Sequence, residues 1–332
     1  MELVCPAGSV NAFKAAVEQG ADAIYIGFND STNARNFSGL NFNDSRARWA
    51  LDMAREKGVK LYVAINTYAQ AAKFQQWQQA VDQAAALGAH AVIMADIGLL
   101  AYAAQRYPQM QRHLSVQASA TSAQALAFYQ QHTGIRRAVI PRVLSLAQIQ
   151  ALCAQSSVGI EVFGFGSLCI MAEGRCHMSS YVTGESPNMQ GVCSPAKFVH
   201  WQENADGSMH SRLNGELIDY FAPGENAGYP TLCKGRFAVE DDTYHAFEAP
   251  TSLNTLELLP ELQAAGVQAI KIEGRQRSPA YVASVVSVWR KAIDSLQHNP
   301  QQFNVLPAWQ NKLSELSEGA QTTFGAYHRS WQ

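Results

Sequence analysis

Four cysteines lie close together in one glycine-rich part of the chain: Cys169, Cys176, Cys193 and Cys233. Thiolates are the ligands of iron–sulfur clusters and of closed zinc sites, so this set of residues predicts a metal centre. None of the gaps between them has the two-residue spacing of zinc ribbons or ferredoxins, so spacing alone does not identify the metal. The alternative from the residues alone is a set of unrelated buried thiols.

The first two cysteines lie in a segment, residues 161–179, that resembles the signature of the collagenase-like peptidase family. That signature reads Glu-x-Phe-x-x-Gly-Ser-hydrophobic-Cys, then four residues, then Gly-x-Cys-x-hydrophobic-Ser, and every position is filled here. We expect the small residues of this segment to bring the backbone close to a bulky inorganic group. The resemblance spans essentially the whole chain, and the chain is similar to the member that acts in oxygen-independent ubiquinone biosynthesis.

One departure from the family pattern follows the third cysteine. Many relatives read Cys-x-Gln-x-Cys-Arg there, whereas this chain reads Cys193-Ser-Pro-Ala-Lys-Phe198 and lacks the nearby fourth ligand. The resemblance implies that Cys233 replaces it. It therefore implies a [4Fe-4S] cluster held by Cys169, Cys176, Cys193 and Cys233.

The resemblance also implies an activity and partners. It implies hydroxylation of the aromatic ring of a ubiquinone precursor without dioxygen, in a heterodimer with a homologous subunit, UbiV. Relatives in the family that hydroxylate RNA bases take the oxygen from prephenate, a dicarboxylate, which is therefore a candidate oxygen donor here. The alternatives are hydroxylation of an RNA base, or a non-catalytic subunit that relays electrons or acts as a scaffold.

Composition bears on these alternatives. The net charge of −2 gives no overall attraction for nucleic acid, so we do not expect nucleic acid as a partner. Only 16% of the residues are charged, against about a quarter in an average soluble domain, which suggests a surface covered by a partner. The sequence contains no Gly-x-Ser-x-Gly or His-Glu-x-x-His motif, so we do not expect peptidase activity.

The start of the chain lacks the features of a secretory signal, and no apolar run approaches the length of a membrane span. We therefore expect a cytoplasmic protein with no membrane span and with reduced cysteines. Cys5, in an apolar strand, and Cys153, in a helical pattern, are expected to be core residues rather than ligands.

Short apolar runs alternate with helical patterns along the first 165 residues, and several helical patterns end in a glycine just before the next strand. This alternation predicts an α/β fold in which parallel strands are joined by helices, a (β/α)8 barrel. We expect residues 1–298 to form the barrel, with an insertion over residues 164–250 above its mouth and a tail over 299–332 that packs on the barrel or on a partner. The predicted strands are 2–5, 23–27, 60–65, 91–95, 113–116, 137–140, 160–163 and 267–272.

Polar residues just after these strands should converge on the C-terminal face of the barrel, where such folds place their chemistry. Three of them are arginines, whose planar fork suits a carboxylate-bearing molecule. The alternatives are helix caps and surface ion pairs. No residue is assigned a catalytic role, and the candidate substrate-binding residues are Asn33, Arg35, Asn66, Gln117, Arg142, Glu273 and Arg275.

Overall fold

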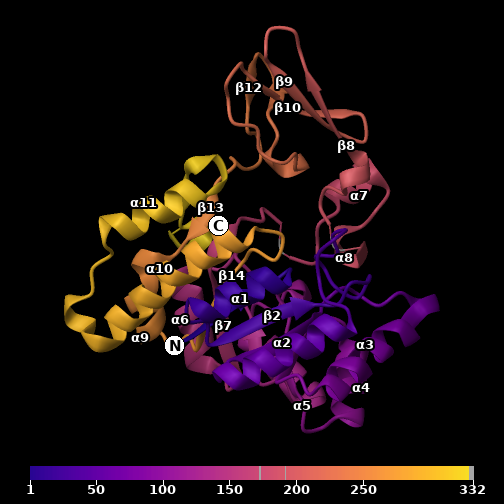
Figure 1. Ribbon diagram of the computed structural model, residues 1–332, viewed down its shortest axis with the longest axis vertical. Coiled ribbons are helices and arrows are strands. Elements are labelled where there is room, and N and C mark those ends of the chain that lie inside the picture. Colours follow the sequence, from indigo (N-terminus) through magenta and orange to yellow (C-terminus); the bar gives the residue numbers. More distant parts are fainter. Residues whose placement is uncertain (172, 191, 329–332) are drawn as a thin grey trace.

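The body of the molecule is a closed barrel of eight parallel strands (Figure 1). The computed structural model describes residues 1–171, 173–190 and 192–328. Each strand pairs with the next in sequence order, and the barrel closes because the last strand pairs in parallel with both the first and the seventh. The predicted (β/α)8 architecture is therefore confirmed. Its strands are β1 (Glu2–Pro6), β2 (Ala23–Gly27), β3 (Lys60–Ile65), β4 (Ala91–Met94), β5 (Gln111–Leu114), β6 (Arg137–Val139), β7 (Gly159–Ser167) and β14 (Ala269–Ile272).

Helices surround the barrel, and short polar residues mark where they begin. The Ser278 side chain accepts a hydrogen bond from the Tyr281 amide and caps the last long helix, which has a proline in its first turn. Gly58, Gly88 and Gly134 end three helices with φ of 67°, 81° and 63°, a conformation that favours glycine. The helices are α1 (Val10–Glu18), α2 (Asp44–Lys57), α3 (Phe74–Leu87), α4 (Ile97–Arg106), α5 (Ala123–Thr133), α6 (Leu146–Gln155), α9 (Leu259–Ala264) and α10 (Pro279–His298).

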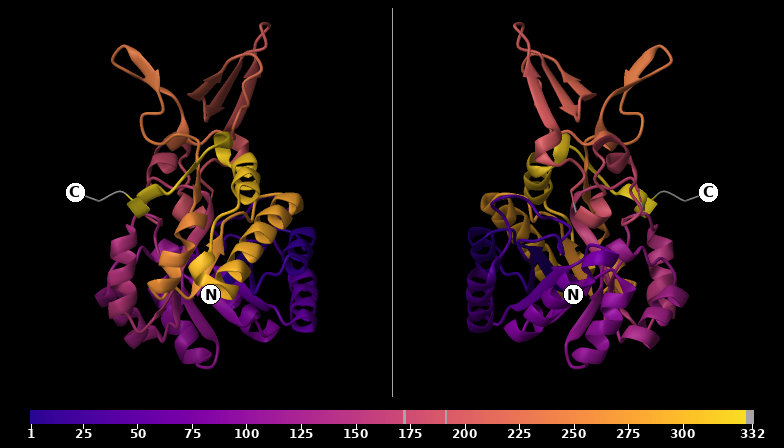
Figure 2. Two further views of the ribbon diagram at one scale, coloured as in Figure 1. Left: turned by 90° about the vertical axis from the view of Figure 1, so that its left-hand side faces the viewer. Right: turned by 90° about the vertical axis from the view of Figure 1, so that its right-hand side faces the viewer.

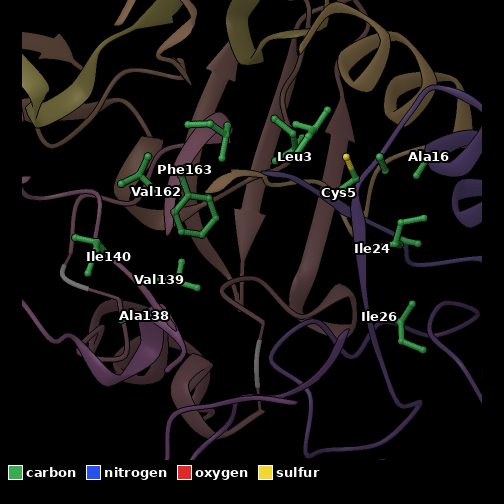
Figure 3. Packing of buried hydrophobic residues seen from close by; sticks show 14 of the residues in the cluster. Leu3, Cys5, Ala16, Ile24, Ile26, Ala138, Val139, Ile140, Val162 and Phe163 are labelled. Carbon is green, nitrogen blue, oxygen red and sulfur yellow. The ribbon is translucent and has the colours of Figure 1, made fainter. Parts of the chain in front are cut away.

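The main hydrophobic core lies between the strands and the surrounding helices. Figure 3 shows side chains such as Leu3, Ile24 and Val162, which are all buried in it. Cys5 is fully buried in the same layer, as its place in the first apolar strand predicted. Cys153 is half-buried and packs against this core. Neither of these two cysteines belongs to the segment that carries the other four.

The interior of the barrel holds a buried network of charged and polar side chains. Glu2 accepts hydrogen bonds from Tyr62 Oη at 2.7 Å and from Arg137 Nη1 at 2.8 Å, and Arg137 also lies 3.3 Å from Glu161. Lys271 Nζ donates to Glu161 Oε1 at 2.8 Å. Burial alone would raise the pKa of Glu2, but the hydrogen bond and charge of Arg137 lower it to about 2. Each buried charge in this network therefore has an opposite charge beside it.

His113 lies next to this network without a hydrogen-bond partner for its Nδ1 atom among the described residues. Its ring packs edge-on against Tyr62, with centroids 4.8 Å apart. Burial lowers the pKa of His113 to about 4, although the charge of Glu161 acts in the opposite direction. The imidazole is therefore neutral at physiological pH.

We expect the free energy of unfolding to fall as the pH is lowered from about 6.5 to about 4, because the unfolded chain protonates His113 in this range and the folded protein does not. His113→Phe keeps a ring against Tyr62 and should remove this part of the pH dependence. Urea unfolding at a series of pH values measures it, with His200→Phe on the exposed surface as the control. An unchanged slope in the His113 variant would contradict the assignment.

The insertion between β7 and β14 forms two small sheets that project away from the barrel (Figures 1 and 2). One is an antiparallel sheet of β8 (Val199–Glu203), β9 (Met209–Leu213) and β10 (Glu216–Phe221). The other is the pair β11 (Phe237–Val239) and β12 (Asp242–Tyr244). The sequence predicts an insertion here but not these strands.

The segment after α10 packs on the barrel. It contains a helix, α11 (Pro307–Leu316), which is not predicted from the sequence, and Leu313 of that helix is fully buried. Further along, β15 (Thr322–Thr323) pairs with β13 (Ser252–Asn254), which in turn pairs with β7. Residues 329–332 of the predicted tail lie outside the described residues. Within the described part of the chain, no helix is both long and apolar enough to cross a membrane.

Candidate thiol site at the barrel mouth

Two glycines shape the chain where it leaves β7. Gly166 has φ of 135°, and an added Cβ there would lie 2.5 Å from the Cβ of Glu273. At Gly174, with φ of 80°, an added Cβ would lie 2.0 Å from the carbonyl oxygen of Gln117. Both glycines therefore allow the chain after β7 to pack against the loops that follow β5 and β14. At these two positions the close neighbours are protein atoms, and the approach of the backbone to an inorganic group stays a prediction.

The four cysteines of the insertion come from four separate short segments. Cys169 follows the C-terminal end of β7, and Cys176 precedes α7 (Met178–Thr183). Cys193 follows α8 (Pro187–Gln190), and Cys233 lies in the single turn Leu232–Lys234 between the two small sheets. All four are free thiols that are partly exposed.

These thiols are close enough to influence one another. Burial raises the pKa of Cys233 to about 12, and the charges of Cys169, Cys193 and Cys176 add to this rise. Burial also raises the pKa of Cys193, again with a contribution from Cys176. The fold thus brings together four cysteines that are up to 64 residues apart in the sequence. Among the described residues, however, no three His, Cys, Asp or Glu side chains converge as the ligands of one metal ion would.

Cationic side chains face the same thiols. Burial and Glu173 raise the pKa of Cys169 to about 11, and Arg142 opposes this rise. For Cys193, the charge of Arg35 and, more weakly, that of Lys234 oppose the effect of burial. Thiolates bound to a cluster carry negative charge, which neighbouring cations stabilise. The donor set and its surroundings therefore fit an anionic thiolate-bound group.

Arg142 is held by contacts within the protein. Its Nε donates to Glu173 Oε1 at 2.7 Å, its Nη1 donates to the Ser167 carbonyl at 2.7 Å, and its guanidinium lies 4.2 Å from the centroid of the Phe163 ring. Burial alone would lower the pKa of Arg142, but Glu173 raises it. These contacts fasten the loop that carries Cys169 to the barrel. A substrate role for Arg142 stays a prediction.

Arg275 and two asparagines hold the loop after β2. Arg275 Nη1 donates to Asn33 Oδ1, and Asn33 Nδ2 donates to the Phe28 carbonyl at 3.1 Å. Asn66 Oδ1 accepts from the Ala34 amide at 3.0 Å. Arg275 is only 5% exposed, and burial lowers its pKa to about 10, so it is cationic at neutral pH. These residues are close together, as predicted, but their observed partners are protein atoms.

Arg35 differs from the other two arginines in its exposure. Its side chain is 26% exposed, and its Nε lies 3.8 Å from Glu273 Oε1. The charge of Arg35 acts on Cys193, so its guanidinium lies near the thiols. Glu273 Oε2 also accepts from the Ser167 amide at 3.4 Å. Of the three predicted arginines, Arg35 is therefore the one most accessible to an anionic ligand beside the cysteines.

Two buried acceptors near the thiols have no donor among the described residues: Gln117 Oε1 and Glu173 Oε2. They belong to neighbouring loops, because Ser119 Oγ donates to the Glu173 carbonyl. An unpaired buried acceptor is costly, so a water molecule or a ligand with an N–H or O–H group is expected here. Glu173 is not among the site residues predicted from the sequence. Only its position in the sequence points to it, because Glu173 is the only acidic residue between Glu161 and Glu185.

Comparisons with known proteins reveal relatives along most of the chain. It is 28% identical to tRNA hydroxylation protein P1 of Bacillus subtilis over 95% of this chain and 68% of that protein. It is 32% identical to tRNA hydroxylation protein P of Escherichia coli over 88% of this chain and 68% of the relative. A more distant relative is the 23S rRNA 5-hydroxycytidine C2501 synthase of Escherichia coli, at 26% identity over 89% of this chain and 40% of that protein.

The family assignment rests on a broader match. The model of peptidase family U32 matches residues 8–330, which include seven of the eight barrel strands, all four cysteines of the insertion and the candidate rim residues. Together with the relative at 32% identity, this match covers far more than the signature segment. The chain therefore belongs to peptidase family U32.

Proposed function

We propose that this protein is a hydroxylase that acts on a base of RNA without dioxygen, using an iron–sulfur cluster bound by Cys169, Cys176, Cys193 and Cys233. The observation that carries the proposal is the similarity to a tRNA hydroxylation protein over 95% of the chain. Relatives that act on tRNA and rRNA favour this alternative over the ubiquinone pathway to which the sequence resemblance pointed.

Four thiolates suit either a closed zinc site or an iron–sulfur cluster. The reaction favours the cluster, because zinc has no redox chemistry. A cluster supplies one-electron chemistry that side chains cannot perform.

The chain's own residues then bind and orient the reactants. In this proposal Arg35, which is partly exposed, binds a carboxylate of the oxygen donor, and prephenate has two carboxylates. The unpaired acceptors Gln117 Oε1 and Glu173 Oε2 accept hydrogen bonds from N–H or O–H groups of the ring that is hydroxylated. Such paired contacts orient a ring more strictly than apolar packing alone does.

A second candidate substrate is the ring of a ubiquinone precursor, with the chain acting like UbiU beside its homologous partner UbiV. The observation that favours it is electrostatic. Residues 199–248, which include Cys233, contain nine acidic and three basic residues, a net charge of −6. This charge repels a phosphate backbone but not a neutral aromatic ring.

The proposal is tested with anaerobically purified protein, alone and with the homologous subunit, incubated with prephenate and each substrate in turn. The substrates are tRNA from a strain that lacks the hydroxylation and an unhydroxylated quinone precursor, and mass spectrometry detects the product. We expect a hydroxylated nucleoside, and about a hundredfold weaker binding of prephenate by Arg35→Met. Arg48→Met, at an exposed position on α2, should behave as wild type.

Each other outcome contradicts the proposal in a different way. A hydroxylated quinone precursor without any hydroxylated nucleoside would replace RNA by the second candidate. Protein with full iron and sulfide content that modifies neither substrate would be an electron-relay or scaffold subunit.

A further inference from the structure

The projecting part of the insertion, residues 199–248, is called the protrusion here. Of the eleven large hydrophobic side chains that are exposed in the described part of the chain, seven lie in these 50 residues. An isolated two-stranded hairpin such as β11–β12 is only marginally stable in water. Aromatic residues are also enriched where proteins bind each other. The seven are Trp201, Leu217, Tyr220, Tyr229, Val239, Tyr244 and Phe247.

The protrusion is also strongly acidic. Its net charge is −6, whereas the whole chain carries −2, so the remaining residues carry +4. Two of its three cations are already paired with carboxylates: Arg236 pairs with Asp219 and Glu225, and Lys234 pairs with Glu318. The turn between β11 and β12 exposes three consecutive carboxylates, at positions 240–242. A protein surface with positive charge and apolar side chains fits this surface, and nucleic acid does not.

The chain itself has a surface that combines positive charge with exposed apolar side chains. Residues 97–160 contain no aspartate or glutamate, and two of their five arginines, Arg106 and Arg136, are exposed. Their outer helices α4, α5 and α6 hold one charged residue, Arg106, in 31 positions, whereas α2 holds seven in 14. Ile97 and Phe128 are 47% and 49% exposed there, and Arg136 is also exposed. We call the outer surface of α4, α5 and α6 the acid-free face. Depletion of charge is typical of the core of a protein interface.

The protrusion cannot reach this face within one molecule. Figure 1 shows the protrusion at one end of the molecule's long axis, and α4 and α5 near the opposite end. Two copies that lie side by side in opposite directions would place each protrusion against the acid-free face of the other. A two-fold axis makes both contacts at once and closes the assembly.

We propose that the protrusion docks on the acid-free face of a second copy of this chain, in a reciprocal antiparallel dimer. The carboxylates at 240–242 lie opposite Arg106 and Arg136, and the exposed aromatic residues of the protrusion cover Phe128. The proposal does not depend on which substrate is hydroxylated. It also accounts for the low proportion of charged residues on these outer helices.

Sedimentation velocity of the full chain tests the proposal over a range of concentrations at low and high salt. We expect twice the monomer mass, with weaker association at high salt because the contacts are charged. The double variants Asp241→Lys/Asp242→Lys and Arg106→Glu/Arg136→Glu should each raise the dissociation constant at least tenfold. Combining all four substitutions exchanges the charges and should restore the dimer.

Glu56→Lys, an exposed substitution on α2, is the matched control and should leave the dimer unchanged. Thermal melts of every variant verify that the fold is intact. A monomer at all concentrations overturns the proposal, and so does a dimer that neither double variant weakens. A monomer that forms a complex only when the homologous subunit is added would replace the second copy by that subunit.

Discussion

Cys233→Ala is expected to abolish iron and sulfide binding in anaerobically prepared protein, together with all hydroxylation. Cys233 is the fourth thiol of the candidate set, and the charges of the other three raise its pKa. A cluster bound by three thiolates loses one iron ligand and becomes exposed to solvent at that position. Iron and sulfide assays and the absorption spectrum of the purified variant measure the effect.

Cysteines outside the thiol site provide the controls. Cys153→Ala on α6 and Cys5→Ala in the core should retain iron and sulfide at the level of wild type. If Cys5→Ala loses them while folding normally, or Cys233→Ala keeps them, the ligand assignment is wrong. Stoichiometric zinc without sulfide after anaerobic isolation would reject the iron–sulfur cofactor itself.

Arg142→Met is expected to destabilise the fold by about 3–5 kcal/mol, because it leaves Glu173 as a buried charge without its partner. The same change removes the bond to the Ser167 carbonyl and should loosen the loop that carries Cys169, so that iron content also falls. Chemical unfolding measures the loss of stability. Adding Glu173→Gln should restore a large part of it, because the double variant contains no unpaired charge.

Arg35→Met gives the matched comparison, since Arg35 is partly exposed and its loss leaves no fully buried charge. We expect it to keep the stability of wild type. If Arg142→Met were as stable as wild type and lost activity alone, Arg142 would contact substrate, as the sequence analysis predicted.

The barrel could be predicted because each of its strands is marked by features that lie close together in the sequence. The segment that becomes β3 is an apolar run that follows a helix ended by Gly58, and the structure has a strand there with the predicted bounds. The strands of the protrusion could not be predicted in this way. β8, Val199–Glu203, has four exposed residues of five, so burial imposes no clear alternation on its sequence.

The candidate site was predictable in part. The cysteines could be identified as a set because their chemistry is distinctive, although their spacing is irregular. The roles of the arginines could not be separated, since Arg35, Arg142 and Arg275 all follow predicted strands in the same way. Their difference depends on partners that are distant in the sequence, such as Glu173 for Arg142 and Asn33 for Arg275. Sequence patterns do not encode such pairings.

The attachment of Cys233 to the barrel has a consequence for how the molecule opens. Lys234 Nζ donates to Ser167 Oγ at 3.2 Å and pairs with Glu318 of the C-terminal segment. These two contacts hold the residue next to Cys233, whose partly exposed thiol a reagent can reach while every barrel strand stays paired. Cys5, in β1, becomes accessible to a reagent only when the barrel itself unfolds. The alkylation rates of these two thiols therefore report two different opening reactions of the same chain, one local and one global.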